Sequence, residues 1–273
     1  MANLPSDPAA VAALAHAGDV EAQLFVGTTL WNAGIEKMLS REREASAPYF
    51  VQAFKLFQQA ALQGDARAQH RVARSYRRGW GVGQSFSDAR VWCRRAAEGG
   101  DADAQCEIAD ECEDEVECAS WYRKAAEQGN AYGQLMLGKK LLSGKGVPLD
   151  CGAGVEWIRK AAEQGNAGAQ CELGKLYEEG RGVAQNLSLA IGWLRKAAEQ
   201  ADRVAQEHLG LLYRDGRGVP QSNAEAWFWL TLSSPWNQQK QATLDAVKAK
   251  LSWGERSAVK ARVEAWSREH QRK

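Results

Sequence analysis

The amino-acid sequence predicts an all-α fold, a solenoid of about six stacked two-helix repeats, and three recurring patterns support this prediction. Copies of the string Arg-Lys-Ala-Ala-Glu-Gln begin at Arg123, Arg159 and Arg195. Copies of Gly-x-Gly-Val begin at Gly79, Gly144, Gly180 and Gly216. A tryptophan series with intervals of 29, 36, 36 and 36 residues comprises Trp92, Trp121, Trp157, Trp193 and Trp229. A fixed period near 36 residues is typical of helical solenoids.

Each repeat is predicted to hold two helices, because its apolar residues recur at helical spacing in two segments. In the fifth repeat, Leu173 and Tyr177 lie on one side of a first helix, and Trp193 and Ala197 lie on one side of a second. The repeats begin at the turn residues Gly18, Gly64, Gly100, Gly129, Gly165 and Ala201. The first repeat is about ten residues longer than the period because of an insertion around residues 35–48. The third is seven residues shorter and lacks Gly-x-Gly-Val.

Glycines recur at two kinds of position, and each kind predicts a feature of the backbone. A mid-helix glycine costs roughly 1 kcal/mol relative to alanine, so its recurrence predicts that the two helices of a repeat pack closely there. These glycines are Gly27, Gly138, Gly174 and Gly210. The loop at residues 180–183 is expected to end a helix in the left-handed conformation and to return its valine to the core. A phosphate-binding loop is the alternative, but the periodic copies favour an architectural role.

The repeats resemble the Sel-1-like repeat (SLR) family, a relative of the tetratricopeptide repeats. The shared pattern is A-x-A-Q-x-x-L-G-x-x-Y-x-x-G-x-G-V followed by A-x-x-W-x-x-K-A-A-E-Q-G-N, over residues 17–236. The resemblance implies an α/α superhelix that scaffolds protein complexes, chiefly in bacteria, without generic catalytic residues. Two repeats depart from the pattern. The first has its insertion and Leu30 in place of the tyrosine, and the third has Cys112 in that place and no loop.

The two ends of the array are expected to be capped, because terminal repeats would otherwise expose an apolar face. The prediction is one solenoid domain over residues 1–273, in which residues 1–17 form an N-terminal cap helix and residues 18–236 hold the six repeats. Residues 237–273 are expected to form two closing helices. Three tryptophans outside the periodic series are expected to pack within this C-terminal cap, with a partner-binding aromatic patch as the alternative: Trp227, Trp236 and Trp253.

Composition and charge limit the class of partner. The formal net charge of +1 argues against a generally basic nucleic-acid binder. No apolar run approaches the roughly 18 residues that suggest a membrane span. The first residues contain no basic segment leading into an apolar one, so no secretory signal is expected. These observations predict a cytoplasmic protein that binds neither nucleic acid nor a membrane.

The six cysteines and four histidines show no spacing typical of catalysis or metal binding. Cys106, Cys112 and Cys118 are six residues apart, so neighbours on a helix would point about 120° away from each other. No Cys-x-x-Cys or nearby histidine pair completes a zinc site. We therefore expect reduced thiols, no metal, no cofactor and no enzymatic activity. A recurring glutamine is expected to satisfy backbone groups between repeats. The series is Gln23, Gln69, Gln105, Gln134, Gln170 and Gln206.

The exposed side of the first helices is predicted to form a partner-binding groove. Positions 3, 6, 10 and 13 after each turn residue are expected to form one exposed stripe, which is basic in the second repeat, acidic in the third and largely apolar in the fourth. The predicted groove residues are Arg67, His70, Arg74, Arg77, Arg78, Asp103, Asp110, Glu113, Asp114, Tyr132, Leu135 and Lys139. Segregated charge of this kind would orient a charged partner segment. The alternative is a solvated face whose charges pair between adjacent repeats.

The sequence thus predicts an adaptor or scaffold whose partner is a protein or peptide. Two other classes stay open. An enzyme or regulator acting on cell-wall or signalling substrates would need a cleft with paired carboxylates of raised pKa, and the acidic third repeat is the place to look for one. A structural assembly subunit would form concentration-dependent oligomers.

Overall fold

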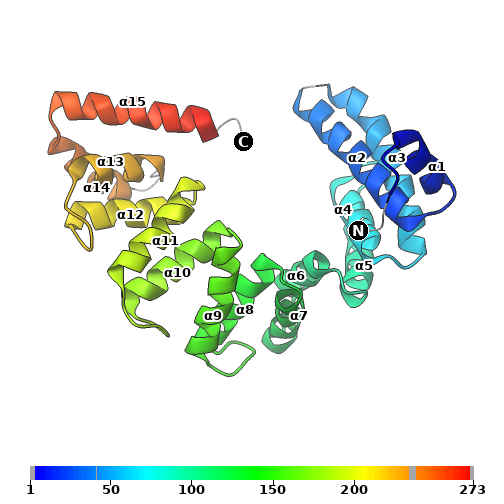
Figure 1. The fold of residues 1–273 in the computed structure, drawn as a ribbon, viewed down its shortest axis with the longest axis horizontal. Coiled ribbons are helices and arrows are strands. Elements are labelled where there is room, and N and C mark those ends of the chain that lie inside the picture. The colour runs from blue at the N-terminus through cyan, green and yellow to red at the C-terminus, as the bar shows by residue number, and fades with distance from the viewer. Residues whose placement is uncertain (1–3, 41, 234–237, 271–273) are drawn as a thin grey trace. The chain divides into compact units, whose positions relative to one another are not determined.

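The computed structural model describes residues 4–40, 42–233 and 238–270, and every regular element in these ranges is an α-helix (Figure 1). The chain divides into two compact units, the N-terminal unit of residues 1–130 and the C-terminal unit of residues 131–273. The helices of the N-terminal unit are α1 (Pro8–His16), α2 (Val20–Leu39), α3 (Arg43–Leu62), α4 (Ala66–Arg78), α5 (Phe86–Glu98), α6 (Ala102–Glu111) and α7 (Glu115–Glu127). Those of the C-terminal unit are α8 (Ala131–Ser143), α9 (Cys151–Glu163), α10 (Ala167–Glu179), α11 (Leu187–Glu199), α12 (Arg203–Asp215), α13 (Asn223–Leu232), α14 (Gln238–Ala249) and α15 (Trp253–His270).

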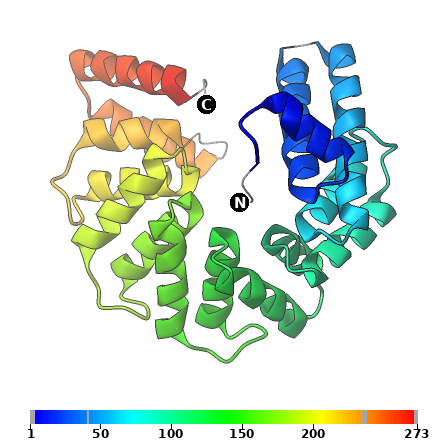
Figure 2. The same ribbon diagram turned by 45° about the vertical axis from the view of Figure 1, so that its right-hand side comes forward.

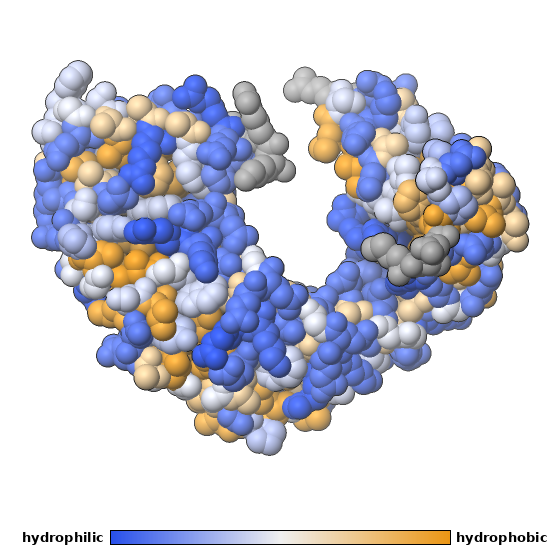
Figure 3. Space-filling view, viewed as in Figure 1, coloured by the Kyte–Doolittle hydropathy of each residue, from blue (hydrophilic) through white to orange (hydrophobic). Residues whose placement is uncertain are grey.

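The predicted all-α class and the two-helix repeat are confirmed, because six consecutive helix pairs run from α2/α3 to α12/α13 (Figure 2). Within the described ranges, none of the helices is both long enough and apolar enough to span a bilayer. On the face seen in Figure 3, hydrophilic side chains cover much of the surface and apolar ones gather in separate patches.

Local sequence signals set the helix ends. Most first helices begin after an Asp or Asn whose side chain accepts a hydrogen bond from the amide three residues later, as Asp65 does from Ala68 at 2.9 Å. This contact satisfies an amide that has no partner inside the helix. Helices α4, α10 and α12 end at glycines in the left-handed conformation, and Gly180 has φ 71°. The predicted helix stop at Gly-x-Gly-Val is therefore confirmed.

The mid-helix glycines lie where two helices of a repeat touch, as predicted. A Cβ added to Gly174 would lie 2.7 Å from Leu194 Cγ and 3.0 Å from the carbonyl oxygen of Ala190, on the partner helix. The second loop glycine is equally confined: a Cβ on Gly182 would lie 2.6 Å from the carbonyl oxygen of Cys151, at the start of the preceding second helix. This Gly-x-Gly-Val loop therefore covers the start of the second helix one repeat earlier.

The two irregular repeats differ from the others in opposite ways. In the first repeat, the insertion lengthens both helices, so that α2 and α3 have 20 residues each. In the third, α6 has only ten residues and stops at Glu111. The sequence predicts Cys112 in the core position of the repeat's tyrosine, but this residue is extended and only half-buried because the helix has already ended.

The recurring glutamine has the structural role expected of it. Gln170 donates a hydrogen bond to the carbonyl oxygen of Ala162 at 3.1 Å, and its own side-chain oxygen accepts one from Gln200 at 2.8 Å. Gln105 repeats both contacts with Ala97 and Gln128. At Gln69 the second contact is lost, because Gly99 takes the place of the donating glutamine, and the Gln69 side-chain oxygen has no hydrogen-bond partner among the described residues.

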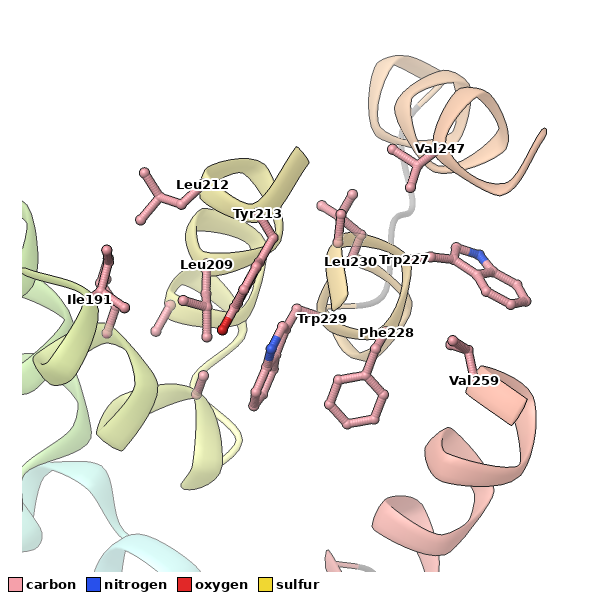
Figure 4. Packing of buried hydrophobic residues seen from close by; sticks show 14 of the residues in the cluster. Ile191, Leu209, Leu212, Tyr213, Trp227, Phe228, Trp229, Leu230, Val247 and Val259 are labelled. Atoms are coloured by element: carbon pink, nitrogen blue, oxygen red, sulfur yellow. The ribbon is translucent and has the colours of Figure 1, made fainter. Parts of the chain in front are cut away.

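The C-terminal cap buries an apolar cluster between α12, α13, α14 and α15 (Figure 4). Trp227 packs into this cluster with Val247 and Val259, as predicted. Trp253 does not, because it begins α15 and its side chain is 85% exposed. Trp236 lies outside the described residues.

Candidate partner-binding face

The first helices within each unit lie side by side, and two recurring contacts show which of their faces meet. The sixth residue after a turn contacts the cap at the start of the next first helix, as His70 Nδ1 does with Asp101 Oδ1 at 3.1 Å. The thirteenth contacts the seventh residue of the next first helix, as Arg77 does with Glu107 at 2.7 Å. Glu178 and His208 make the same contact with reversed charge, at 2.8 Å.

These contacts correct the predicted stripe. Positions 6 and 13 face the next first helix, whereas positions 3, 7, 10 and 14 keep part of their surface exposed. His70 and Leu135 at position 6 are each 6% exposed, and Cys106 is also buried. Successive residues of a helix differ by 100° in direction, so positions 6 and 7, or 13 and 14, can lie on different sides of the helix.

His70 joins α4 to α6 by two ion pairs. Its Nδ1 lies 3.1 Å from Asp101 Oδ1, and its Nε2 lies 3.1 Å from Glu107 Oε1. Burial disfavours the charged imidazolium, but the hydrogen bonds and charges of the two carboxylates outweigh it and raise the pKa of His70 to about 9. For Glu107, burial is likewise outweighed, by His70 first and then by Arg77, and its pKa falls to about 2. The pair is therefore charged at neutral pH.

Two of the predicted groove arginines belong to the same kind of contact. Arg77 Nη1 binds Glu107, and its Nη2 lies 3.1 Å from Glu111 Oε1. Arg67 pairs with Glu21 on α2 and with Asp65 at the start of its own helix. For Arg67, His70 and Arg77 the alternative interpretation is confirmed, since their charges pair between adjacent repeats.

Two arginines on α4 differ from these three. Arg71 and Arg74 are half-buried, and neither forms an ion pair with any residue that the structure describes. Burial lowers the pKa of Arg71 below its ordinary value, and the positive charge of Arg74 acts in the same direction, whereas the charges of Asp101 and Asp103 oppose this shift. Arg78 instead lies over the ring of Trp80, 4.7 Å from its centroid.

An exposed aromatic side chain lies at the equivalent position of the preceding first helix. Phe25 occupies position 7 of α2, the position that Arg71 occupies in α4, and is 56% exposed. The predicted groove does not include Phe25 or Arg71, because its stripe omits position 7. The signal was present in the sequence, since other repeats place Glu107, Glu172 or His208 there and only the first places an aromatic.

Three of the predicted acidic residues accept hydrogen bonds from nearby groups of the protein. Asp103 accepts a hydrogen bond from Asn130 at 2.7 Å, and Asp110 accepts one from the hydroxyl of Tyr122. Asp114 caps α7 by accepting a hydrogen bond from the amide of Glu117 at 2.7 Å. Glu113 and Asp114 are not on the first helix as expected, because α6 ends before them.

The predicted residues of the fourth repeat lie on α8 in the C-terminal unit. Tyr132 and Lys139 are exposed there, as expected. Leu135 is not, because it packs toward α10, where a Cβ on Gly168 would lie 3.4 Å from Leu135 Cδ2. Leu135 therefore belongs to the core of that unit and not to a binding surface.

Cys93 on α5 completes the buried cluster around Glu107, with its Sγ 3.6 Å from Glu107 Oε2. A thiol, a histidine and a carboxylate could in principle form a nucleophilic site. Here burial, followed by the charge of Glu107, raises the pKa of Cys93 to about 12, so that it stays a thiol at neutral pH. The lowered pKa of Glu107 is the opposite of what a general acid needs. The cluster is a contact between helices.

Helix pairs joined by close glycine contacts and bridged by buried glutamines define a helical repeat protein of the kind that presents side chains for protein recognition. The chain matches the Sel1 repeat at residues 50–65, 66–101, 113–130, 131–166, 167–202 and 203–234, and it belongs to this family. The match omits residues 102–112, which include α6. Proteins of this family generally mediate protein–protein interaction, and the repeat is typically non-catalytic.

Two of the solved structures that are similar to this chain illustrate the match. A protective antigen of uropathogenic Escherichia coli strains with an SLR fold is 25% identical, with a TM-score of 0.59. The alignment covers 96% of this chain but only 64% of the antigen's length. A Sel1 repeat protein from Oxalobacter formigenes is 24% identical, with a TM-score of 0.67, and the alignment covers 85% of this chain and 93% of that protein. No curated protein matches the chain.

Proposed function

We propose that this protein is a cytoplasmic, non-catalytic adaptor that binds an acidic segment of a partner protein on the arginine face, which we define as Phe25, Arg71 and Arg74. The observation that carries the proposal is the pair Arg71 and Arg74, which lacks an ion-pair partner among the described residues. Neighbouring Arg67, His70 and Arg77 on the same helix are all paired.

The energetic argument concerns what an unpaired charge costs. Partial burial of a guanidinium removes hydrating water, and two adjacent guanidinium groups repel each other. A carboxylate from a partner would remove both penalties and form charge-assisted hydrogen bonds. The acidic segment would therefore lie along α4, across positions 7 and 10.

Phe25 supplies the apolar part of the proposed face. An aromatic side chain exposed beside charged residues is the kind of anchor that contributes most to binding energy. Arg67 pairs with Glu21 across α4 and α2, which places the two helices next to each other at this end. The partner segment is therefore expected to carry an apolar residue next to its acidic ones.

The test is affinity capture from the native organism, followed by binding measurements with the purified partner. Arg71→Gln combined with Arg74→Gln should weaken binding by at least about tenfold and reduce its dependence on salt. A matched control replaces two exposed arginines of the C-terminal unit, Arg203→Gln and Arg268→Gln. If both double variants bind the partner as the unaltered protein does, the arginine face is not the binding site.

A further inference from the structure

The third repeat contains a pocket at a place that a tyrosine occupies in the fifth and sixth repeats. It has a volume of about 290 Å³ and lies in the N-terminal unit between α5, the end of α6 and the start of α7. Its lining includes Arg94, Ile108, Cys112 and Glu117. None of these residues belongs to the arginine face, so the pocket is a separate feature.

The corresponding place in the fifth and sixth repeats holds a tyrosine. Arg159 Nη2 donates a hydrogen bond to the hydroxyl of Tyr177 at 3.3 Å, and Arg195 Nη2 donates one to Tyr213 at 2.6 Å. Each arginine begins the recurring Arg-Lys-Ala-Ala-Glu-Gln string, and each tyrosine comes from the next repeat. By this register Arg94 is the equivalent arginine and Cys112 stands in the tyrosine's place.

Two differences distinguish this place in the third repeat. Cys112 has no ring that could fill the space beside Arg94, where the pocket of about 290 Å³ lies. The missing Gly-x-Gly-Val loop leaves the start of α5 uncovered, whereas other loops cover Phe50 and Cys151 at the equivalent place. Phe86, the first residue of α5, is accordingly 68% exposed.

Arg94 lies in this pocket without the tyrosine that its equivalents Arg159 and Arg195 bind. Arg94 Nη1 lies 3.6 Å from Glu117 Oε1, which is beyond hydrogen-bond distance. The equivalent guanidinium groups of Arg159 and Arg195 bind a phenol hydroxyl, which can accept a hydrogen bond without carrying a charge. A carboxylate ligand would fit less well, because Glu117, Glu113 and Asp114 already line the pocket.

We infer that this pocket binds a tyrosine side chain on a loop of the partner protein, which supplies in trans the tyrosine that the third repeat lacks. The phenol ring would lie against Ile108 and Cys112, and its hydroxyl would accept a hydrogen bond from Arg94. The assignment of the tyrosine to a partner protein rests on the proposed adaptor function, whereas the binding of a phenol in the pocket is independent of that function.

The pocket is tested with p-cresol, which is the tyrosine side chain alone, and with toluene, which lacks the hydroxyl. Each is titrated into the full-length, isotope-labelled protein, and the amide signals of Ile108 and Cys112 and the side-chain signal of Arg94 are followed by NMR. We expect saturable shifts with p-cresol at millimolar concentration, because so small a ligand can gain little free energy. Toluene should bind about tenfold more weakly, because it cannot accept the hydrogen bond from Arg94.

Three variants separate the pocket from general apolar binding. Cys112→Tyr should fill the pocket from within and abolish p-cresol binding. Arg94→Met should lower the affinity for p-cresol to that for toluene. This variant keeps the test decisive if Cys112→Tyr does not fold. Arg123→Met is the matched control, since Arg123 is the equivalent exposed arginine on α7 but does not line the pocket, and it should change affinity by less than about twofold.

Two results would overturn the inference. One is equal binding of p-cresol and toluene, or no binding of either. The other is p-cresol binding that persists in Cys112→Tyr. With a captured partner, Cys112→Tyr should weaken binding even though the arginine face is intact. If it does not, while Arg71→Gln with Arg74→Gln still does, the pocket assignment fails and the adaptor function stands.

Discussion

The contact between the first helices α4 and α6 in the N-terminal unit is made by charged side chains, whereas the contact of α8 with α10 in the C-terminal unit is made by leucines. Positions 6 and 13 are His70 and Arg77 on α4, where both bind Glu107. The same positions on α8 are Leu135 and Leu142, which are buried in an apolar cluster with residues of α9 and α10. One helical geometry thus accepts two chemically different contacts.

This difference shows which contacts every repeat needs and which contacts can vary. Close glycine contacts hold the two helices of a repeat together and recur in both units. The surface between repeats needs only complementary side chains, whether leucine against glycine or imidazolium against carboxylate. The stabilisation by a buried ion pair depends on its geometry and on pH. The stabilisation by a buried leucine depends on the apolar area removed from water and not on pH.

The largest effect is expected at the apolar contact. Leu142→Ala should destabilise the protein by about 2–5 kcal/mol, because Leu142 is only 4% exposed and its truncation leaves a cavity. The loss should be the same at pH 6 and at pH 10, as measured by chemical denaturation. A loss of stability that changed with pH would contradict the distinction between the apolar contact and the charged contact.

A smaller and pH-dependent effect is expected at the charged contact. His70→Leu, which places the leucine of the fourth repeat in the second, should cost about 2–3 kcal/mol at pH 6. The pKa of His70 is raised from 6.5 to about 9 in the folded state, so its contribution is complete below pH 6.5 and is lost as pH rises through 9. Denaturation of both proteins at pH 6 and pH 10 measures the difference, which should nearly vanish at pH 10.

At low pH the stability of the same contact depends on Glu107. Its pKa is lowered from 4.5 to about 2, so its contribution is present above pH 4.5 and is lost as pH falls toward 2. The contribution of His70 should therefore be greatest between these limits, at about pH 4.5–6.5. An equal cost of His70→Leu at pH 6 and pH 10 would show that His70 acts by packing and not by charge.

The smallest effect separates the two kinds of arginine on α4. Arg77→Gln should cost about 1 kcal/mol, because it removes two ion pairs that are partly exposed. Arg74→Gln should change stability by less than about 0.5 kcal/mol, since it has no ion pair to lose among the described residues. Parallel thermal melts of the two variants provide the measurement. Equal losses would mean that Arg74 is also part of the fold, and the arginine face would lose its main support.

Periodicity in the amino-acid sequence by itself determined much of this protein's fold. The 36-residue spacing placed all six helix pairs, the glycine series located the tight contacts within repeats, and the glutamine series located the bridges between them. These features depend on local backbone requirements, such as the left-handed conformation at Gly180, or on residues that recur at every copy. The sequence also showed that the third repeat was irregular, through Cys112 and the missing loop.

Only the tertiary structure decided which side of the first helices is exposed. Helical spacing shows that one side of a helix is apolar, but the neighbouring repeat decides which of the polar positions it covers. In the second repeat, the neighbour α6 covers positions 6 and 13, which places His70 and Arg77 in a contact with α6 and leaves Arg71 and Arg74 without ion-pair partners among the described residues. The same holds for the pocket beside Arg94, because an empty volume depends on side chains from three helices. The physical reason is that solvent exposure and pairing are properties of contacts between distant residues, which a local pattern does not contain.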